Sequence, residues 1–290
     1  MAAVLALVLA APAGQEAVLW EKLRGRLQAI EARVDGVLAV SVEDLSSGRT
    51  IEIHQDAVLA TASSIKPAIL LELYHAAAAR RLDLAEAAPL PTPRVGGGGP
   101  LELVGDGSRL TWRDLAALMM SYSDNDATNA LIERLGLDAI ERRLQSLGLA
   151  HTHLRRRMLD LAAARRGDEN VSTAAELRGL MKAVHAAAGL PAPLADDLRA
   201  VAALPKRSEF EVPHPERVRL LSKTGTLDGV RCFAAVVELP HRPYAIAVMA
   251  AHLRDEPKGE AAVREAALEV LSTFERLALD SEYGRARLRE

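Results

Sequence analysis

The strand-like segments of this sequence lie in two groups near its two ends, and helical patterns fill the long middle. Residues 37–43 and 50–53 flank a Ser-Ser-Gly turn, which predicts a hairpin. Three more strand-like runs follow much later, at residues 217–224, 230–239 and 244–252. The fold must therefore bring together strands that are far apart in the sequence.

Helical periodicity surrounds and separates these two groups. Leu19, Leu23, Leu27 and Ile30 recur every three or four residues, so an amphipathic helix is predicted over residues 16–34. The other predicted helices are at residues 63–80, 111–121, 126–136, 137–147, 173–188, 193–203 and 259–277.

This order of elements predicts an α+β fold, an α/β/α sandwich with an additional all-helical lobe. Strands from both ends would join one mainly antiparallel five-stranded sheet, and the two terminal helices would cover one of its faces. We expect residues 16–60 and 215–280 to form the sheet-containing lobe and residues 61–214 the helical lobe. Ligand sites favour clefts between such lobes.

Composition excludes several classes of function. The 36 basic and 39 acidic residues give a net charge of −3, and this balance does not favour nucleic acid as a partner. The single cysteine, Cys232, excludes an internal disulfide and a cysteine-based zinc cluster. His151 and His153 form the only close histidine pair and have no acidic neighbours at ligand spacing, so we expect no metal and no cofactor. We expect a monomer without a membrane span in the mature chain.

The N-terminal segment resembles a short secretory signal. Residues 2–11 are all apolar and are followed by Ala11-Pro12-Ala13, an A-x-A cleavage pattern. The segment lacks a Lys or Arg before its apolar run, and the alternative is the first turn of a core helix. We expect residues 1–13 to be a signal peptide that directs a bacterial protein to the periplasm or the medium.

Ser63-Ser64-Ile65-Lys66 opens the predicted helix at 63–80. Residues three apart share a helix face, so Lys66 can reach the Ser63 hydroxyl and accept its proton. The helix N-terminus also favours developing negative charge. Taken alone, the motif favours the alternative of an N-capping serine followed by a solvated lysine.

Two further motifs follow. Ser123-Asp124-Asn125 lies at a predicted corner between helices, where Ser123 could relay a proton and Asn125 could donate to a substrate carbonyl. The alternative is an ordinary helix N-cap. Residues 223–226 read Lys-Thr-Gly-Thr at a predicted strand end. Lys223 and Thr224 offer a charge and a hydroxyl to a carboxylate there, and Gly225 allows a ligand close to the backbone.

With these three motifs in this order, the chain resembles the penicillin-recognising serine hydrolases, and most closely the class A beta-lactamases. The resemblance covers residues 16–280, including the Thr-Trp-Arg-Asp-Leu helix start at 111–115. It implies one beta-lactamase-like catalytic unit acting on a small-molecule beta-lactam, or on an acyl-peptide or ester.

The resemblance also implies roles for individual residues. Ser63 would be the nucleophile that forms an acyl-enzyme, Lys66 its base or proton relay, and Ser123 the donor to the leaving nitrogen. The remaining substrate-binding residues would be Asn125, Lys223, Thr224, Gly225, Thr226 and Arg231, with the N–H groups of Ser63 and Thr226 forming an oxyanion hole. Arg231 could equally be a surface charge on its strand.

The long predicted loop at 151–170 departs from the family pattern. Class A enzymes have a glutamate there that activates the deacylating water, in an E-x-x-L-N arrangement. Alignment on Leu161 places Met158 at the glutamate position and Ala162 at the asparagine position. Asp160 is the nearest carboxylate; it is either a replacement base or an acid paired with one of the neighbouring arginines.

Three functions stay open at this point. The first is a serine beta-lactamase whose deacylation is slow. The second is a related serine peptidase or esterase that beta-lactams acylate and inhibit. The third is a sensor domain that binds the acyl group without turnover.

Overall fold

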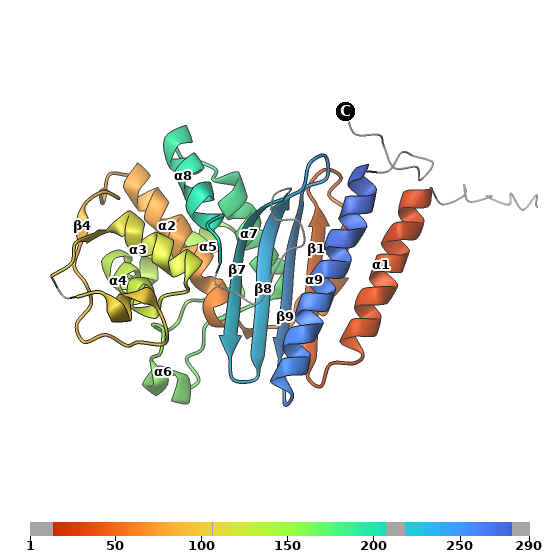
Figure 1. Cartoon of the computed structure of the whole chain (residues 1–290), viewed down its shortest axis with the longest axis horizontal. Helices are drawn as coiled ribbons and strands as arrows, with labels where there is room; N and C mark the ends of the chain where they lie inside the picture. The colour runs from red at the N-terminus through yellow and green to blue at the C-terminus, as the bar shows by residue number, and fades with distance from the viewer. Residues whose placement is uncertain (1–13, 106, 207–217, 280–290) are drawn as a thin grey trace, which may run out of the picture.

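The computed structural model of the chain describes residues 14–105, 107–206 and 218–279. The predicted signal peptide lies outside these residues. A five-stranded sheet, antiparallel throughout, lies at the centre in the order β2-β1-β9-β8-β7 (Figure 1). Its strands are β1 (Val37–Asp44), β2 (Thr50–Ile53), β7 (Arg219–Leu227), β8 (Val230–Glu238) and β9 (Tyr244–Ala251). The pairing of β1 with β9 joins the two strand groups and confirms the predicted sheet.

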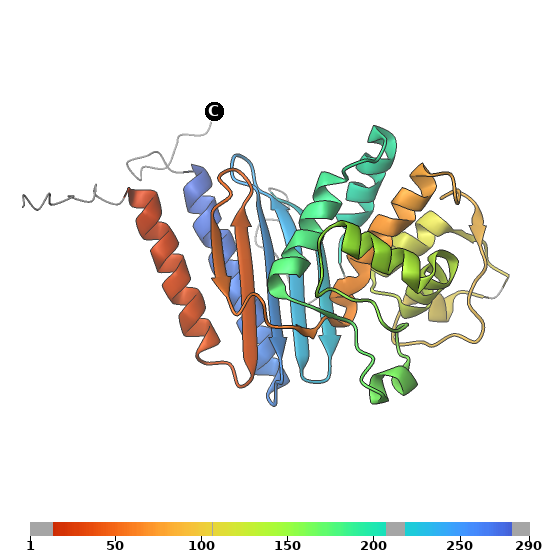
Figure 2. The ribbon, with the colours of Figure 1, turned by 180° about the vertical axis from the view of Figure 1, so that it is seen from behind.

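Two helices cover one face of the sheet: α1 (Gln15–Glu31) and α9 (Glu256–Leu279) (Figures 1 and 2). Between helices and sheet lies an apolar core in which Trp20 of α1 meets Phe274 of α9 edge to face, with ring centroids 5.6 Å apart. Phe233 and Val237 of β8 point into the same core. The terminal helices thus lie where the sequence predicts.

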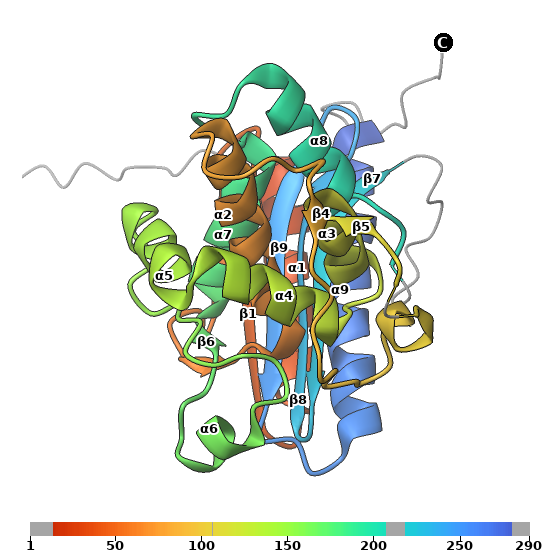
Figure 3. The ribbon, with the colours of Figure 1, turned by 90° about the vertical axis from the view of Figure 1, so that its left-hand side faces the viewer.

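The opposite face of the sheet packs against the helical lobe. Successive residues of a strand point to opposite faces, so Cys232, Ala234 and Val236 of β8 belong to this second core. The helices of this lobe are α2 (Lys66–Ala78), α3 (Trp112–Ser121), α4 (Asn125–Leu135), α5 (Leu137–Ser146), α6 (Leu161–Arg165), α7 (Ala174–Ala186) and α8 (Ala192–Ala202), and Figure 3 shows this side of the molecule. Helix α2 is buried along most of its length and packs against the others.

Three details differ from the sequence-based expectation. The predicted helix over 63–80 begins with a separate 3-10 turn, η1 (Ala62–Ile65). The predicted loop at 151–170 contains the short helix α6, which protrudes in Figure 3. Strand β7 continues to Leu227, so Lys-Thr-Gly-Thr lies within the strand and not at its end. Pairing with β8 extends this strand, with Thr226 opposite Arg231.

Short elements complete the chain. They are β3 (Leu59–Ala60) paired with β6 (Val171–Ser172), β4 (Ala87–Ala88) paired with β5 (Leu110–Thr111), and the 3-10 turn η2 (Pro100–Leu103). None of the helices within the described ranges is both long and apolar enough to cross a bilayer.

Candidate active site

Ser63 lies in η1, directly before α2 and beside β7. The preceding Ala62 has a left-handed backbone with φ +49°, a conformation that side chains other than glycine rarely adopt. Ser64 is buried, and its Oγ donates to the Thr61 carbonyl at 2.6 Å. The partly exposed Ser63 hydroxyl has no hydrogen-bond partner among the residues that the structure describes. Of the two adjacent serines, only Ser63 is therefore available to a ligand.

Lys66 is fully buried and is the first residue of α2. Its Nζ donates to the Ser123 carbonyl at 2.6 Å, to Ser123 Oγ at 3.0 Å and to Asn125 Oδ1 at 3.1 Å. Burial lowers the pKa of Lys66 to about 7, against an opposing effect of Asp124. At neutral pH a large share of this amine is therefore unprotonated and able to accept a proton.

The Ser123-Asp124-Asn125 corner joins α3 to α4 and presents two of its three side chains to Lys66. Ser123 has φ +59°, a strained conformation that aims both its carbonyl and its hydroxyl at the ammonium. Asp124 is the N-cap of α4, accepting from the Ala127 N–H at 2.8 Å. The motif therefore serves both as a helix cap and as part of the site.

The glycine-rich segment at 96–99 lies against this corner. A Cβ added to Gly99 would overlap the Asp124 carboxylate, and one added to Gly97 would lie 2.5 Å from Asn125 Nδ2. Asn125 Nδ2 also donates weakly to the Gly96 carbonyl, at 3.4 Å. The absence of side chains at these glycines lets the loop pack directly on the Asn125 amide and orient it.

The Lys-Thr-Gly strand meets η1 from the other side. A Cβ on Gly225 would overlap the Thr61 carbonyl and lie 2.9 Å from the Ser64 nitrogen, so this glycine permits close packing of β7 on the turn. This contact gives a different reason for Gly225 from the predicted approach of a ligand. Lys223 is 2% exposed, and burial, with the nearby charges of Lys66 and Lys206, holds its pKa well below the usual value.

Thr224 and Thr226 are more accessible than Lys223 and Gly225. They lie on β7, the edge strand of the sheet, where half of the backbone groups have no neighbouring strand to bind. They also line a hollow of about 1160 Å³ between β7 and α9. An extended ligand beside Ser63 could therefore pair with this edge.

Arg231 lies on β8, and its contacts are with α9 and with the turn between β7 and β8. Its guanidinium forms ion pairs with Glu256 at 2.8 Å and Glu260 at 3.3 Å, both on α9. It also donates to the Leu227 and Val230 carbonyls at 2.9 Å. Arg231 is thus held on the α9 side of the sheet, and none of these contacts joins it to the lysines near Ser63.

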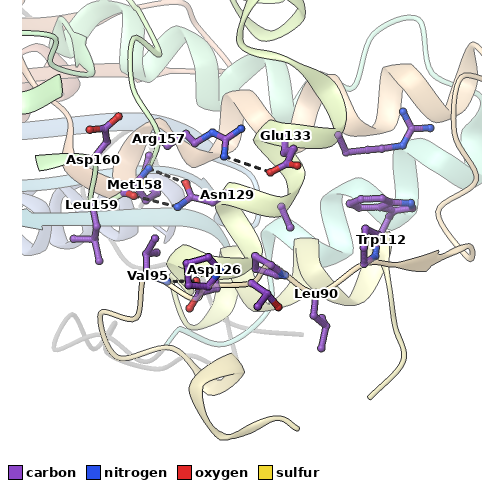
Figure 4. A pocket seen from close by; sticks show the side chains of 16 residues that line it. Leu90, Val95, Trp112, Asp126, Asn129, Glu133, Arg157, Met158, Leu159 and Asp160 are labelled. Carbon is purple, nitrogen blue, oxygen red and sulfur yellow. Dashed lines mark hydrogen bonds and ion pairs between the residues drawn. The ribbon is translucent and has the colours of Figure 1, made fainter. Parts of the chain in front are cut away.

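Met158 is buried, and its backbone is held by one side chain of α4. Asn129 Oδ1 accepts from the Met158 N–H at 2.8 Å, and Asn129 Nδ2 donates to its carbonyl at 3.1 Å (Figure 4). Asn129 is one helical turn beyond Asn125. The following Leu159 has φ +58°, so the backbone turns sharply at this point.

Asp160 is the N-cap of α6, and its Oδ1 accepts from the Ala163 N–H at 2.9 Å. The carboxylate lines a separate hollow of about 830 Å³ together with Met158, Leu159 and residues of α4 (Figure 4). Its observed partner is a backbone N–H of its own segment, and the structure brings it into no contact with Ser63, Lys66 or Ser123 among the described residues.

Sequence reasoning missed three residues that shape this site: Ala62, Asn129 and Lys206. Asn129 was detectable, since it lies four residues after Asn125 on a predicted helix and so shares its face. The strained Ala62 and the buried Lys206 have no such signal. Among the described residues no cluster of His, Cys, Asp and Glu could hold a metal ion.

Comparison with known proteins gives consistent relationships. A family model described as the beta-lactamase enzyme family matches residues 22–274. The beta-lactamase SME-1 of Serratia marcescens is 27% identical over 146 residues, 50% of each protein. An imipenem-hydrolyzing beta-lactamase of Enterobacter cloacae is 27% identical over 156 residues, 53% of each. The chain thus spans about half the length of the curated relatives it matches.

Solved structures match over most of the chain. A beta-lactamase from Sphaerobacter thermophilus has a TM-score of 0.79 and 27% identity, covering 88% of this chain and 98% of its own. PBP-A has a TM-score of 0.78 and 24% identity, covering 88% and 96% respectively. The second match supports the fold alone.

Proposed function

Because the chain belongs to the beta-lactamase enzyme family, we propose that it is a serine hydrolase that opens beta-lactam rings through an acyl-enzyme on Ser63. One observation carries the proposal. Lys66, a buried lysine with a pKa of about 7, opens α2 directly after the turn that carries Ser63, and it is hydrogen-bonded to Ser123 and Asn125. Such an amine is suited to accept a hydroxyl proton at neutral pH.

Acylation in this proposal uses four groups, which we call the acylation cluster: Ser63, Lys66, Ser123 and Lys223. Neutral Lys66 takes the Ser63 proton as Oγ attacks the lactam carbonyl. The hydrogen bond between Lys66 Nζ and Ser123 Oγ, at 3.0 Å, offers a route by which that proton reaches the leaving nitrogen. The N–H groups of Ser63 and Thr226 stabilise the oxyanion, and Lys223 with Thr224 binds the substrate carboxylate.

Deacylation is proposed to be slow. A water molecule that attacks the ester needs a base, and a thioether at position 158 cannot accept a proton. The Asn129 hydrogen bonds hold the Met158 backbone beside α4, so the position is structurally kept while its chemistry is lost. Asp160 is engaged as a helix cap.

The slow deacylation favours a second candidate on the same site. A serine peptidase or esterase, or an acyl-binding sensor, would also be acylated by a beta-lactam and would then stall. For each of these functions we propose that the protein is a monomer, that it is exported to the periplasm or the medium, and that it binds a small acyl donor. As a beta-lactamase with sufficient turnover, it would act in antibiotic resistance.

Time-resolved mass spectrometry of the full chain with penicillin G tests these alternatives. We expect one covalent adduct per protein on Ser63, which forms quickly and decays slowly. Steady hydrolysis of a chromogenic cephalosporin would select the beta-lactamase; a stable adduct together with ester or peptide turnover would select the second candidate. Absence of any adduct on Ser63 would overturn the common mechanism.

A further inference from the structure

The hollow between β7 and α9 has a strand backbone with threonine side chains on one side and helix carboxylates on the other. Thr224, Gly225 and Thr226 of the edge strand form one side, and Glu256 and Glu260 of α9 lie on the other. Its volume is about 1160 Å³, large enough for a substituent beyond the reacting ring. Three cations line it: Lys206, Arg231 and Arg264. Arg264 lies on α9 one turn beyond Glu260, which leaves the other two as the lining cations that do not belong to α9.

Arg231 is already neutralised. Two carboxylates, Glu256 and Glu260, lie within 3.3 Å of its guanidinium, and two backbone carbonyls accept from Nη1. A substrate carboxylate would have to compete with both glutamates for this group. Arg231 therefore contributes little net positive charge to the hollow.

Lys206 lines the same hollow without such a partner. Its Nζ donates to the Ala202 carbonyl at 2.9 Å and to the Leu204 carbonyl at 2.8 Å, at the end of α8. An ammonium has three donors, so one remains. No carboxylate in the described part of the chain lies within 4.0 Å of this ammonium.

Lys206 is also electrostatically close to Lys223. Burial lowers the pKa of Lys206 to about 8, and its charge contributes to the depressed pKa of Lys223. Burial disfavours the charged forms of both amines, and a bound anion would offset that cost. The carbonyls at the end of α8 hold Lys206 in place.

We propose that Lys206 is a substrate-binding residue that, with Lys223, holds the carboxylate of the acyl donor along the Thr224–Thr226 edge. This inference rests on the proposed function, in which Lys223 and Thr224 bind the substrate carboxylate, and adds Lys206 as a further specificity-determining residue for acyl donors that carry a free carboxylate. Lys206 would then have the substrate-binding role that the sequence analysis gave to Arg231.

The test compares penicillin G with its methyl ester, which lacks the negative charge. We expect Lys206→Met to weaken binding of the free acid about tenfold, as measured by the concentration dependence of acylation, with the limiting acylation rate little changed. Lys206→Arg should restore most of the loss. For the methyl ester, Lys206→Met should change binding less than twofold.

Lys22→Met is the matched control, because it removes the same charge from an exposed site on α1. It should leave binding of both compounds unchanged. An equal loss for acid and ester would assign Lys206 a purely structural role as a helix-end contact and overturn the proposal. An unaffected Lys206→Met protein would overturn it as well.

Calorimetric titration of penicillin G into the Ser63→Ala protein separates this inference from the proposed function. Binding is then measured without chemistry. Weaker binding in the Ser63→Ala, Lys206→Met double variant supports Lys206 even if the Ser63 protein never forms an adduct. Equal affinity in the two variants, with a normal adduct in the Ser63 protein, removes the role of Lys206 and leaves the proposed function standing.

Discussion

The acylation cluster and the segment at 157–160 contact successive turns of α4, through Asn125 and Asn129 respectively, yet they differ in what their contacts preserve. In the cluster the side chains themselves are held: Lys66 has three acceptors, and β7 packs directly on the Ser63 turn. In the segment the backbone is held by Asn129, while the Met158 side chain only packs in the apolar core. A fold can therefore fix the backbone of a residue without giving its side chain a polar contact.

Ser63→Ala should have the largest effect of the variants that test this comparison. Removal of the Oγ nucleophile should abolish the covalent adduct, because the buried Ser64 hydroxyl is committed to the Thr61 carbonyl. Intact-protein mass spectrometry with penicillin G measures the result, and thermal unfolding verifies that the variant is folded. An adduct on the variant would place the nucleophile elsewhere.

Lys66→Met should lower the acylation rate by about 10²–10⁴, the usual contribution of a general base. In the unmutated protein the neutral fraction of Lys66 grows as pH rises through about 7. The acylation rate should therefore fall about tenfold per pH unit well below 7 and level off above it. A flat rate between pH 5 and 8, measured with penicillin G, would exclude Lys66 as the base.

Met158→Glu sharpens the comparison by returning a base to the held backbone position. We expect decay of the acyl-enzyme to accelerate about 100-fold, with acylation changed little. Burial would raise the pKa of the new carboxyl, so the gain should appear as pH rises. Met158→Gln is the matched control, because it has the same length and no base; an equal gain in both variants would refute a base mechanism.

Gly225→Ala tests the contact between β7 and the Ser63 turn. The added methyl group would overlap the Thr61 carbonyl, so we expect about 1–3 kcal/mol lower stability and slower acylation. Gly25→Ala is the control, since a Cβ on that α1 residue meets nothing within 4 Å and should stabilise the helix. Chemical denaturation measures both, and a Gly225→Ala protein as stable as the parent would contradict the packing argument.

Substitution of Asp160 should have the smallest effect on decay of the acyl-enzyme. Asp160→Asn keeps an N-cap acceptor for Ala163 and removes the carboxylate, so decay of the acyl-enzyme should change less than twofold. Asp160→Ala also removes the cap and should cost about 1 kcal/mol in local stability. If Asp160→Asn slowed deacylation tenfold, Asp160 would be the missing base after all.

The sheet, its two covering helices and the helices of the lobe follow from periodicity in the sequence, because apolar spacing records which face of an element is buried. The grouping of Lys66, Ser123 and Asn125 follows from the family resemblance and from the helix starts that carry them. The ion pairs of Arg231 with Glu256 and Glu260 could not be predicted from the sequence, since they depend on how β8 packs against α9. The left-handed Ala62 likewise depends on packing between η1 and β7.

The antiparallel pairing of Val40 with Val248 has a consequence for biosynthesis. During synthesis, the first two of the five strands of the central sheet are made about two hundred residues before β9, the strand that pairs with β1. Contacts between residues so far apart in the sequence slow folding. Until β9 is made, the edge of β1 that pairs with it has no partner strand. Because β7 is joined to β1 only through β8 and β9, Lys223 takes its place in the same sheet as β1 only after β9 has been made.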